Sequence, residues 1–350
     1  MYKKICIFLL VFSLLGNKSQ ACTSVIVSAR VTVSGKPLML KHRDTDFLDN
    51  KMVRIVGEKY DFVALANASD TVGEVWAGTN TAGFCIMNTA TYDLKDDDVP
   101  FSEMDKEGFL MHRALEICSS VKDFEVYLDT LRRPMGVEAN FGVIDAIGGA
   151  AYYEVNNHSW VKFDVNDASV APDGYMVVTN FTRTGRVEDR KGVDRFDRAC
   201  EIMATVPRSF GKGSFGKIDI DYKYLINRIS RSGKPIERDI TSASIVFEGV
   251  EPGRKNPCAV MWTVLGFPSN APIVPLIAVE KDNLPDFMKH HSLDKGSAGE
   301  DELAAKFKRI YEDWASEKIR NGAFYRKYDA IMTKFYGSYR YIVVESDKND

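Results

Sequence analysis

The chain is poor in the residues and motifs that bind metals and cofactors. It has five histidines, and its six cysteines include no CxxC pair, whereas a structural zinc site needs about four closely spaced Cys or His ligands. It also lacks a GxGxxG stretch and a phosphate-binding loop. We therefore expect neither a metal nor a cofactor.

The composition also gives little support to a nucleic-acid partner or to a membrane span. The formal charge is −3, and acidic and basic residues are interspersed, so no basic stripe is available to neutralise nucleic-acid phosphates. After the first 21 residues no apolar run approaches the length of about 20 residues that crosses a bilayer. We predict no nucleic-acid partner and no membrane span, and we leave a homo-oligomer open.

What the chain does have is an N-terminal segment typical of export. Lys3 and Lys4 precede an apolar run at residues 5–15, and Ser19 and Ala21 are small residues at the positions before a cleavage site. That run is too short to span a bilayer. The pattern predicts a signal peptide at residues 1–21 and a periplasmic or secreted protein.

Cleavage after Ala21 would make Cys22 the first residue of the mature chain. Its thiol and a free α-amine would then belong to one residue. An α-amine titrates near pKa ~8 and can accept the thiol proton, which is the one-residue form of an activated nucleophile. We interpret Cys22 as a catalytic nucleophile.

Two other interpretations of Cys22 stay open. It could be an ordinary buried or disulfide-bonded cysteine, although removal of Cys6 with the leader leaves an odd number of cysteines and hence at least one free thiol. It could also be lipidated, with its amine acylated and lost as a base. Lipoprotein signals usually carry an aliphatic residue three positions before the cysteine, and this chain has Ser19 there.

The hydrophobic pattern predicts two sheets with helices outside them. Apolar and polar residues alternate at 23–30 and 37–43 around a Ser-Gly turn, which predicts a β-hairpin. Helical spacing predicts two helices within 109–131 and another at 193–204, with strands between and after them. Strands and helices in this order, without alternating βαβ units, are typical of an α+β fold.

Two motifs near the N-terminus resemble a known group of enzymes. They are CTS at residues 22–24, after a processing site, and RDTDF at residues 43–47. Together they resemble the N-terminal nucleophile hydrolases that act on linear amides, a group that includes choloylglycine hydrolases, penicillin V acylases, acid ceramidases and isopenicillin N acyltransferases. The resemblance implies a four-layer αββα sandwich over residues 22–280, to which we add a helical C-terminal extension at 281–350.

The same resemblance implies roles for the nucleophile and for two residues beside it. The Cys22 thiolate would attack an amide carbonyl after the α-amine takes its proton. Asp46 would hydrogen-bond near that amine, and Arg43 would lie beside the sulfur, where a cation favours the thiolate.

Three later motifs extend the resemblance in the expected order. They are GTNTAGFCIMN at 78–88, which ends in Asn88, VVTNF at 177–181, which contains Asn180, and the predicted helix that carries Arg195. The resemblance implies that the backbone N–H of Asn88 and the side-chain amide of Asn180 hold the negative carbonyl oxygen, and that Arg195 orients them. Loss of one such donor typically costs about a hundredfold in rate.

Two features narrow this interpretation. The relatives that act on bile salts and penicillin V commonly have Asn-Met-Asp after the arginine, whereas this chain has Asp44, Thr45 and Asp46, so a bile-salt substrate is not implied. A papain-like Cys–His pair would need His42 or His158 as the base, but no cysteine has the sequence context of that family. Alternation also places His42 on the strand face opposite Arg43.

The sequence therefore predicts an exported amidohydrolase that cleaves a linear, non-peptide acyl-amide C–N bond through a thioester on Cys22. Two alternatives remain. One is an acyltransferase that moves the acyl group to an amine acceptor, and the other is a non-catalytic lipoprotein lipidated at Cys22.

Overall fold

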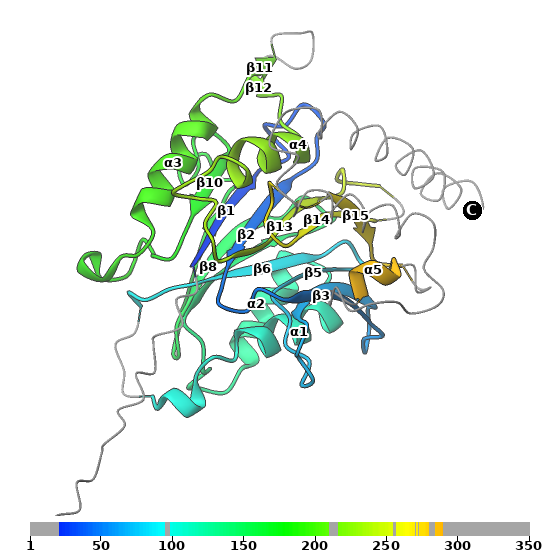
Figure 1. Ribbon diagram of the computed structural model, residues 1–350, viewed down its shortest axis with the longest axis vertical. Helices are drawn as coiled ribbons and strands as arrows, with labels where there is room; N and C mark the ends of the chain where they lie inside the picture. The colour runs from blue at the N-terminus through cyan, green and yellow to red at the C-terminus, as the bar shows by residue number, and fades with distance from the viewer. Residues whose placement is uncertain are drawn as a thin grey trace, which may run out of the picture.

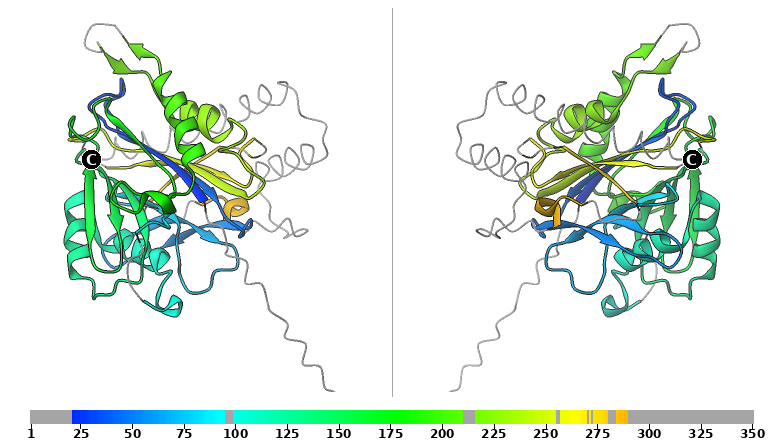
Figure 2. Two further views of the ribbon diagram at one scale, coloured as in Figure 1. Left: turned by 90° about the vertical axis from the view of Figure 1, so that its left-hand side faces the viewer. Right: turned by 90° about the vertical axis from the view of Figure 1, so that its right-hand side faces the viewer.

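The computed structural model describes residues 21–94, 99–209, 216–254, 257–269, 271, 273–279 and 284–289. In these residues two antiparallel sheets lie against each other, and helices cover the outer face of each sheet (Figures 1 and 2). The layers follow the order helix, sheet, sheet, helix. The predicted α+β class and αββα arrangement are thus confirmed.

The first sheet has six strands in the order β10-β1-β2-β13-β14-β15. Strands β1 and β2 form the predicted antiparallel hairpin and lie in the interior of the sheet, between β10 and β13. All of their residues are buried, because both faces of this part of the sheet are covered. The strands are β1 (Ala21–Val27), β2 (Leu38–Asp44), β10 (Tyr175–Val178), β13 (Thr241–Glu248), β14 (Val260–Leu265) and β15 (Val274–Ile277).

The second sheet has seven strands that follow one another in chain order. Each strand pairs antiparallel with the next, so the sheet is a simple meander with helices inserted between β6 and β7. Its strands are β3 (Asn50–Ile55), β4 (Phe62–Asn67), β5 (Ala77–Asn80), β6 (Cys85–Ala90), β7 (Ala139–Ile144), β8 (Ala150–Val155) and β9 (Trp160–Asp164).

Helices α1 and α2 cover the second sheet. Helix α2 begins after Ser120, whose side chain accepts a hydrogen bond from the backbone N–H of Asp123, as an N-cap does. Phe124 and Leu128 lie one turn apart on the buried face of this helix. The helical elements on this side are η1 (Phe101–Glu103), α1 (Glu107–Ile117) and α2 (Val121–Thr130).

The first sheet is covered by α3, α4 and η3. Helix α3 matches the predicted 193–204 helix and packs on β1 and β10, whereas α4 and η3 pack on β13. These elements are α3 (Val193–Ala204), α4 (Tyr222–Tyr224) and the π-helix η3 (Leu225–Ser230). The remaining short elements are η2 (Val187–Asp189), the β11–β12 pair (Arg208–Ser209 and Lys217–Ile218) and α5 (Asp286–Lys289).

Strands β1 and β2 have two buried faces with different neighbours. Val25 and Leu40 belong to the apolar cluster beneath α3 and η3, whereas Ile26 and Met39 belong to the cluster between the two sheets. Successive side chains of a strand point to opposite faces. The inner face of β2, as we call the side toward the second sheet, therefore carries Lys41 as well as Met39.

Some predictions fall outside the described residues. They include the signal peptide up to residue 20 and the helical extension at 281–350, of which only 284–289 are described. The domain bounds therefore stay predictions. In the described part of the chain, no helix has the length and apolar character that would let it cross a membrane.

Candidate active site

The pairing of β1 with β2 places Cys22 directly opposite Arg43. Partners in an antiparallel pair have their side chains on the same face, and here that face is turned toward the second sheet. Cys22 is buried, with 5% of its surface exposed. The candidate site therefore begins at the end of the hairpin, between the two sheets.

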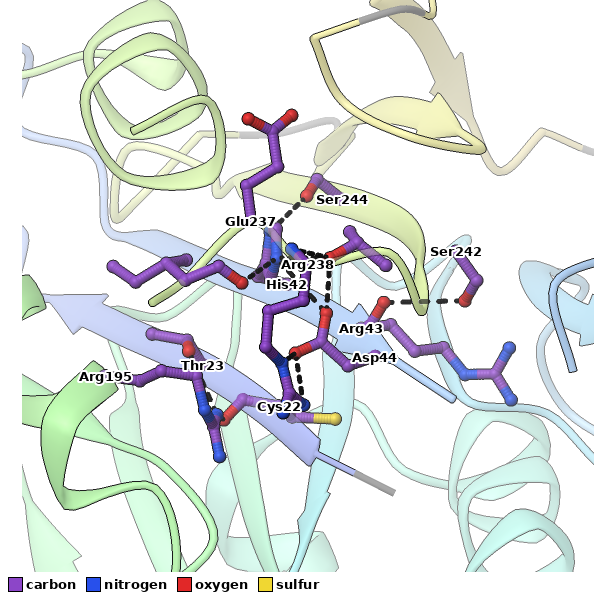
Figure 3. A network of polar contacts seen from close by, with 12 residues as sticks. Cys22, Thr23, His42, Arg43, Asp44, Arg195, Glu237, Arg238, Ser242 and Ser244 are labelled. Carbon is purple, nitrogen blue, oxygen red and sulfur yellow. Dashed lines mark hydrogen bonds and ion pairs between the residues drawn. The ribbon is translucent and has the colours of Figure 1, made fainter. Parts of the chain in front are cut away.

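Arg195 on α3 holds the backbone around Cys22. Its Nη1 donates to the Cys22 carbonyl oxygen and, at 3.2 Å, to Thr23 Oγ1, and its Nη2 donates to Asn180 Oδ1 at 2.7 Å. Figure 3 shows the Arg195 guanidinium beside Cys22. Burial lowers the pKa of Arg195, while the negative charge of Asp44 opposes this change. One buried guanidinium thus joins the nucleophile strand to Asn180.

The turn that delivers Arg195 requires glycine. Gly192 precedes α3 with φ of 75°, a left-handed conformation that side chains other than glycine rarely adopt. A Cβ at this position would lie 2.1 Å from Arg195 Nη2. Gly192 therefore provides both the chain reversal and the space for the guanidinium.

Asn180 contacts the Cys22 nitrogen. The Cys22 N–H donates to Asn180 Oδ1 at 2.7 Å, and Asn180 Nδ2 donates to the Ala90 carbonyl at 2.7 Å. A guanidinium has no acceptor, so the contact with Arg195 fixes which side of the amide is oxygen. In this arrangement Asn180 Nδ2 is engaged with Ala90, and Asn180 orients the nitrogen of Cys22 rather than the acyl oxygen that the resemblance implied.

Arg43 is held as a cation without a carboxylate partner among the described residues. Its guanidinium donates to Asn50 Oδ1 and, at 2.9 Å, to Asn67 Oδ1, and it lies 5.3 Å from the centre of the Trp76 ring. Burial lowers its pKa to about 10, and the charge of Cys22 acts in the opposite direction. Arg43 therefore stays positive near neutral pH, next to the nucleophile.

Asn88 is linked to the site through Lys41, which the sequence analysis did not single out. Lys41 Nζ donates to Asn88 Oδ1 at 2.6 Å, to the Asn88 carbonyl at 2.9 Å and to the Trp76 carbonyl at 2.7 Å. Lys41 lies two residues before Arg43, and strand alternation is the signal that could have placed both on one face. Burial lowers its pKa to about 7, the charge of Cys22 raises it, and Arg43 lowers it further.

Asp46 is the one predicted site residue that the structure leaves apart. It lies in the turn after β2 with an exposed side chain, and no hydrogen bond within the described residues joins it to Cys22. The nitrogen of Cys22 is bonded to Asn180 instead. The other predicted residues are all buried. Cys22, Arg43 and Asn88 lie on the side between the two sheets, and Asn180 and Arg195 hold the backbone of Cys22.

The opposite side of β2, its outer face, carries a closed network of polar contacts (Figure 3). His42 bonds through Nδ1 to Ser244 Oγ at 2.8 Å, and its Nε2 lies 3.4 Å from Asp44 Oδ1. Asp44 also accepts from Thr241 Oγ1 at 2.6 Å and from Arg238 Nε at 2.9 Å. These groups bond to the segment 236–241 and to β13 rather than to the second sheet.

Asp44 is ionised within this network. Burial opposes ionisation, but the hydrogen bond and charge of His42, the Thr241 hydroxyl and the charge of Arg238 outweigh it, so the pKa of Asp44 lies below its usual value. As predicted, His42 lies on the face opposite Arg43, and it therefore cannot serve as a base for Cys22. His158 is exposed in the turn between β8 and β9.

The other cysteines differ from Cys22 in their surroundings. Burial raises the pKa of both Cys85 and Cys118 to about 12, which keeps them as neutral thiols. Cys22, Cys85, Cys118 and Cys200 are free thiols. The same residues contain no group of three or more His, Cys, Asp or Glu side chains arranged to hold a metal ion.

Comparison with protein-family models and with curated protein sequences finds no match. Solved structures do show similarity. An N-acylethanolamine-hydrolyzing acid amidase ortholog from Caenorhabditis elegans is 17% identical, with 67% of this chain and 94% of that chain covered and a TM-score of 0.49. Penicillin V acylase from Agrobacterium tumefaciens is 12% identical (73% and 86% covered, TM-score 0.43).

A third solved structure is a mutant of conjugated bile acid hydrolase from Clostridium perfringens. It is 14% identical, with 75% of this chain and 93% of that chain covered and a TM-score of 0.46. These proteins are of the kind that the sequence motifs resemble. At such identities and scores, the function has to be inferred from the site itself.

Proposed function

We propose that this protein is an exported amidohydrolase that cleaves a linear, non-peptide acyl-amide C–N bond. In this proposal the leader is removed after Ala21, Cys22 is the nucleophile, and its α-amine is the general base. The substrate is a small acyl amide, and no cofactor takes part.

One observation carries the proposal. The nitrogen of Cys22 is held at 2.7 Å by Asn180 Oδ1, and Arg195 fixes both that oxygen and the Cys22 carbonyl. Any buried backbone N–H needs an acceptor, but here the acceptor is a side-chain amide that a buried arginine orients. A free amine held in this way would lie beside its own thiol in a fixed orientation, which is what proton transfer between them requires.

The first half of the reaction forms a thioester. The α-amine of Cys22 takes the thiol proton, and Sγ forms a bond to the carbonyl carbon of the amide. The C–N bond then breaks, and the proton passes from the α-amine to the leaving nitrogen, which departs as an amine. Arg43 lies next to the sulfur and favours the negative charge that forms there.

The second half returns the enzyme to its starting state. A water molecule gives one proton to the α-amine as its oxygen bonds to the acyl carbon. The S–C bond breaks, the sulfur takes that proton back, and the acyl group leaves as a carboxylic acid. An amine acceptor in place of water would form a new amide, so hydrolysis and acyl transfer share every step up to the thioester.

The experiment begins with the N-terminus of the exported protein. Intact mass with N-terminal fragmentation should show a chain that starts at unmodified Cys22. Activity is then measured on a panel of chromogenic N-acyl anilides and N-acyl amino acids. Cys22→Ala should lose at least about a thousandfold in kcat/KM, because truncating a covalent nucleophile removes the thioester route.

Cys200→Ala is the matched control, because Cys200 is a half-buried free cysteine on α3. It should keep wild-type activity. Full activity in Cys22→Ala would sink the proposal. A diacylglyceryl-modified, N-acylated Cys22 would also exclude it and indicate a lipoprotein, while new amides formed in the presence of added amines would indicate acyl transfer.

A further inference from the structure

Lys41 is a buried ammonium whose three N–H donors match three acceptors. Only 1% of its surface is exposed, and its partners are the Trp76 carbonyl, the Asn88 carbonyl and Asn88 Oδ1, at 2.6–2.9 Å. No carboxylate pairs with it among the described residues. Burying a charge costs free energy unless its surroundings compensate, and a methionine would fill the same space without that cost.

The ammonium fixes the orientation of the Asn88 side chain. Lys41 has no acceptor while it is charged, so the amide atom that faces it must be the oxygen. Asn88 Nδ2 then points away from Lys41, and no hydrogen bond within the described residues uses it. The amide donor is therefore oriented and free to bind another group.

Asn88 lies close to the nucleophile. Strand β6 packs against β1, and Asn180 Nδ2, which belongs to the residue that binds the Cys22 nitrogen, donates to the carbonyl of Ala90, two residues after Asn88. Thr89 between them donates to the Thr179 carbonyl at 2.7 Å. The end of β6 is thus tied to the same segment that orients Cys22.

We propose that Lys41 is a positioning residue of the amidase reaction, because its ammonium holds the Asn88 amide so that Nδ2 donates to the acyl oxygen as negative charge develops there. This inference rests on the proposed function. It goes beyond it by assigning the oxyanion donor to the side chain of Asn88 and the orientation of that donor to Lys41.

The protonation state of Lys41 supports this role. With a pKa of about 7, it carries three donors below that pH and only two above it, so deprotonation removes one of the bonds that hold Asn88. The titratable groups that face it are Cys22 and Arg43. Two residues lie opposite Lys41 on the neighbouring strands. They are the apolar Ile245 on β13 and Ser24 on β1, whose hydroxyl bonds to Tyr152.

The test compares Lys41→Met with Lys51→Met. Lys51 on β3 also donates to two backbone carbonyls, those of Ala68 and Asp70 at 3.1 Å, and it makes none of the contacts of the candidate site. Lys41→Met should lower kcat by about tenfold to a hundredfold, with KM changed less than about threefold, because the lost contact acts on the transition state. Lys51→Met should leave both constants unchanged.

Two further readouts separate positioning from a general loss of structure. The ratio of wild-type kcat to Lys41→Met kcat should fall as pH rises through about 7, because the α-amine base, which titrates near pKa ~8, affects both proteins alike. In an Asn88→Ala background, Lys41→Met should cause less than about a twofold further loss, because residues that act through one another are not additive. An undiminished loss in that background would overturn the inference.

Failure of this inference and failure of the proposed function give different results. If Cys22→Ala is inactive while Lys41→Met has wild-type kcat, the proposed amidase function is supported and the positioning role of Lys41 is contradicted. If no amide is cleaved, NMR still reports on Lys41 through the side-chain amide resonance of Asn88. That resonance is assigned by its loss in Asn88→Ala. It should titrate near pH 7 in the wild-type protein, and a resonance that stays fixed over roughly pH 6 to 8 contradicts the inference.

Discussion

The two faces of β2 carry charge in different ways. On the outer face Asp44 is bonded to His42 and Arg238, so the buried carboxylate has cationic or hydrogen-bonding partners on every side. On the inner face Lys41 and Arg43 are both buried, and among the described residues they bond only to neutral acceptors. The β2 residues of both faces are buried, yet only the outer face pairs a cation with a carboxylate.

This difference separates stability from chemistry. A closed network of buried ions holds its own groups in place and leaves nothing for a ligand. Two buried cations without a carboxylate favour whatever negative charge forms between them, and in the proposed reaction that charge forms first on the Cys22 sulfur and then on the acyl oxygen. Changes on the inner face should therefore affect turnover, and changes on the outer face should affect unfolding.

Arg195 should produce the largest effect, because it holds the nucleophile strand and Asn180 together. Arg195→Met removes the contacts that orient the Cys22 nitrogen. We expect kcat/KM to fall by about a hundredfold to a thousandfold, as misplacement of a reacting group typically costs. Steady-state kinetics on the amide panel measures this loss.

Arg198→Met is the control for that variant. Arg198 lies on the same helix, is exposed, and pairs with Glu201 at 3.0 Å, so its loss should leave kinetics unchanged. If both arginine variants retain activity, the contacts of Arg195 with Cys22 and Asn180 are structural only, and the proposed orientation of the Cys22 nitrogen loses its support.

Asp44 tests the outer face. Asp44→Asn breaks a buried ion pair with Arg238 and should lower the free energy of unfolding by about 3 kcal/mol. Because the folded pKa of Asp44 lies below its unfolded value of 3.8, its ionisation stabilises the fold fully above that pH. The contribution is lost as pH falls from 3.8 toward the folded pKa. Urea unfolding of both proteins should therefore show a large difference at pH 7 that shrinks in acid.

The exposed pair of Arg186 and Asp189, 2.6 Å apart, supplies the comparison. Asp189→Asn should leave the midpoint of urea unfolding nearly unchanged, because solvent screens the pair. At pH 7, Asp44→Asn should keep kcat within about tenfold of the wild type, since Asp44 influences the site only by its electrostatic interaction with Arg195. A loss in kcat with unchanged stability would reverse the roles of the two faces.

Much of this arrangement follows from strand alternation, and some of it does not. The pattern of residues 23–43 predicted the hairpin, and the same period of two placed His42 opposite Arg43, as the structure has them. Strand period depends only on local backbone geometry, so one sequence suffices. The 193–204 helix was likewise readable from its own spacing.

The contacts that join distant segments were not readable in the same way. The orientation of Asn180 depends on Arg195 and on Ala90, which is 90 residues away in the chain. Strand alternation places Lys41 on the same face as Arg43, but its burial was not predictable. A lysine on a strand is usually solvated, and the burial of Lys41 depends on how the second sheet packs against the first. Asp46 was predicted to lie near the Cys22 amine from the resemblance alone. The turn after β2 leaves its side chain exposed.

The smallest effect should come from a neutral contact on the inner face. Ser24, which lies beside Lys41 in the sheet, bonds to Tyr152 of the second sheet at 2.7 Å. Tyr152→Phe leaves the Ser24 hydroxyl without this partner and should cost about 1 kcal/mol in unfolding free energy. It removes no charge, so kcat should stay within about twofold of the wild type.

Tyr153→Phe is the matched variant, since Tyr153 is the next residue of β8 and bonds to Glu125 at 3.2 Å on the side of the sheet that α2 covers. Thermal unfolding and kinetics of both variants should show small stability losses with unchanged turnover. A strong loss of kcat in Tyr152→Phe alone would mean that close packing between the sheets, and not the two cations, is what the inner face contributes. Unchanged kcat in Tyr152→Phe beside a reduced kcat in Lys41→Met would assign the effect to charge and hydrogen bonding at Lys41.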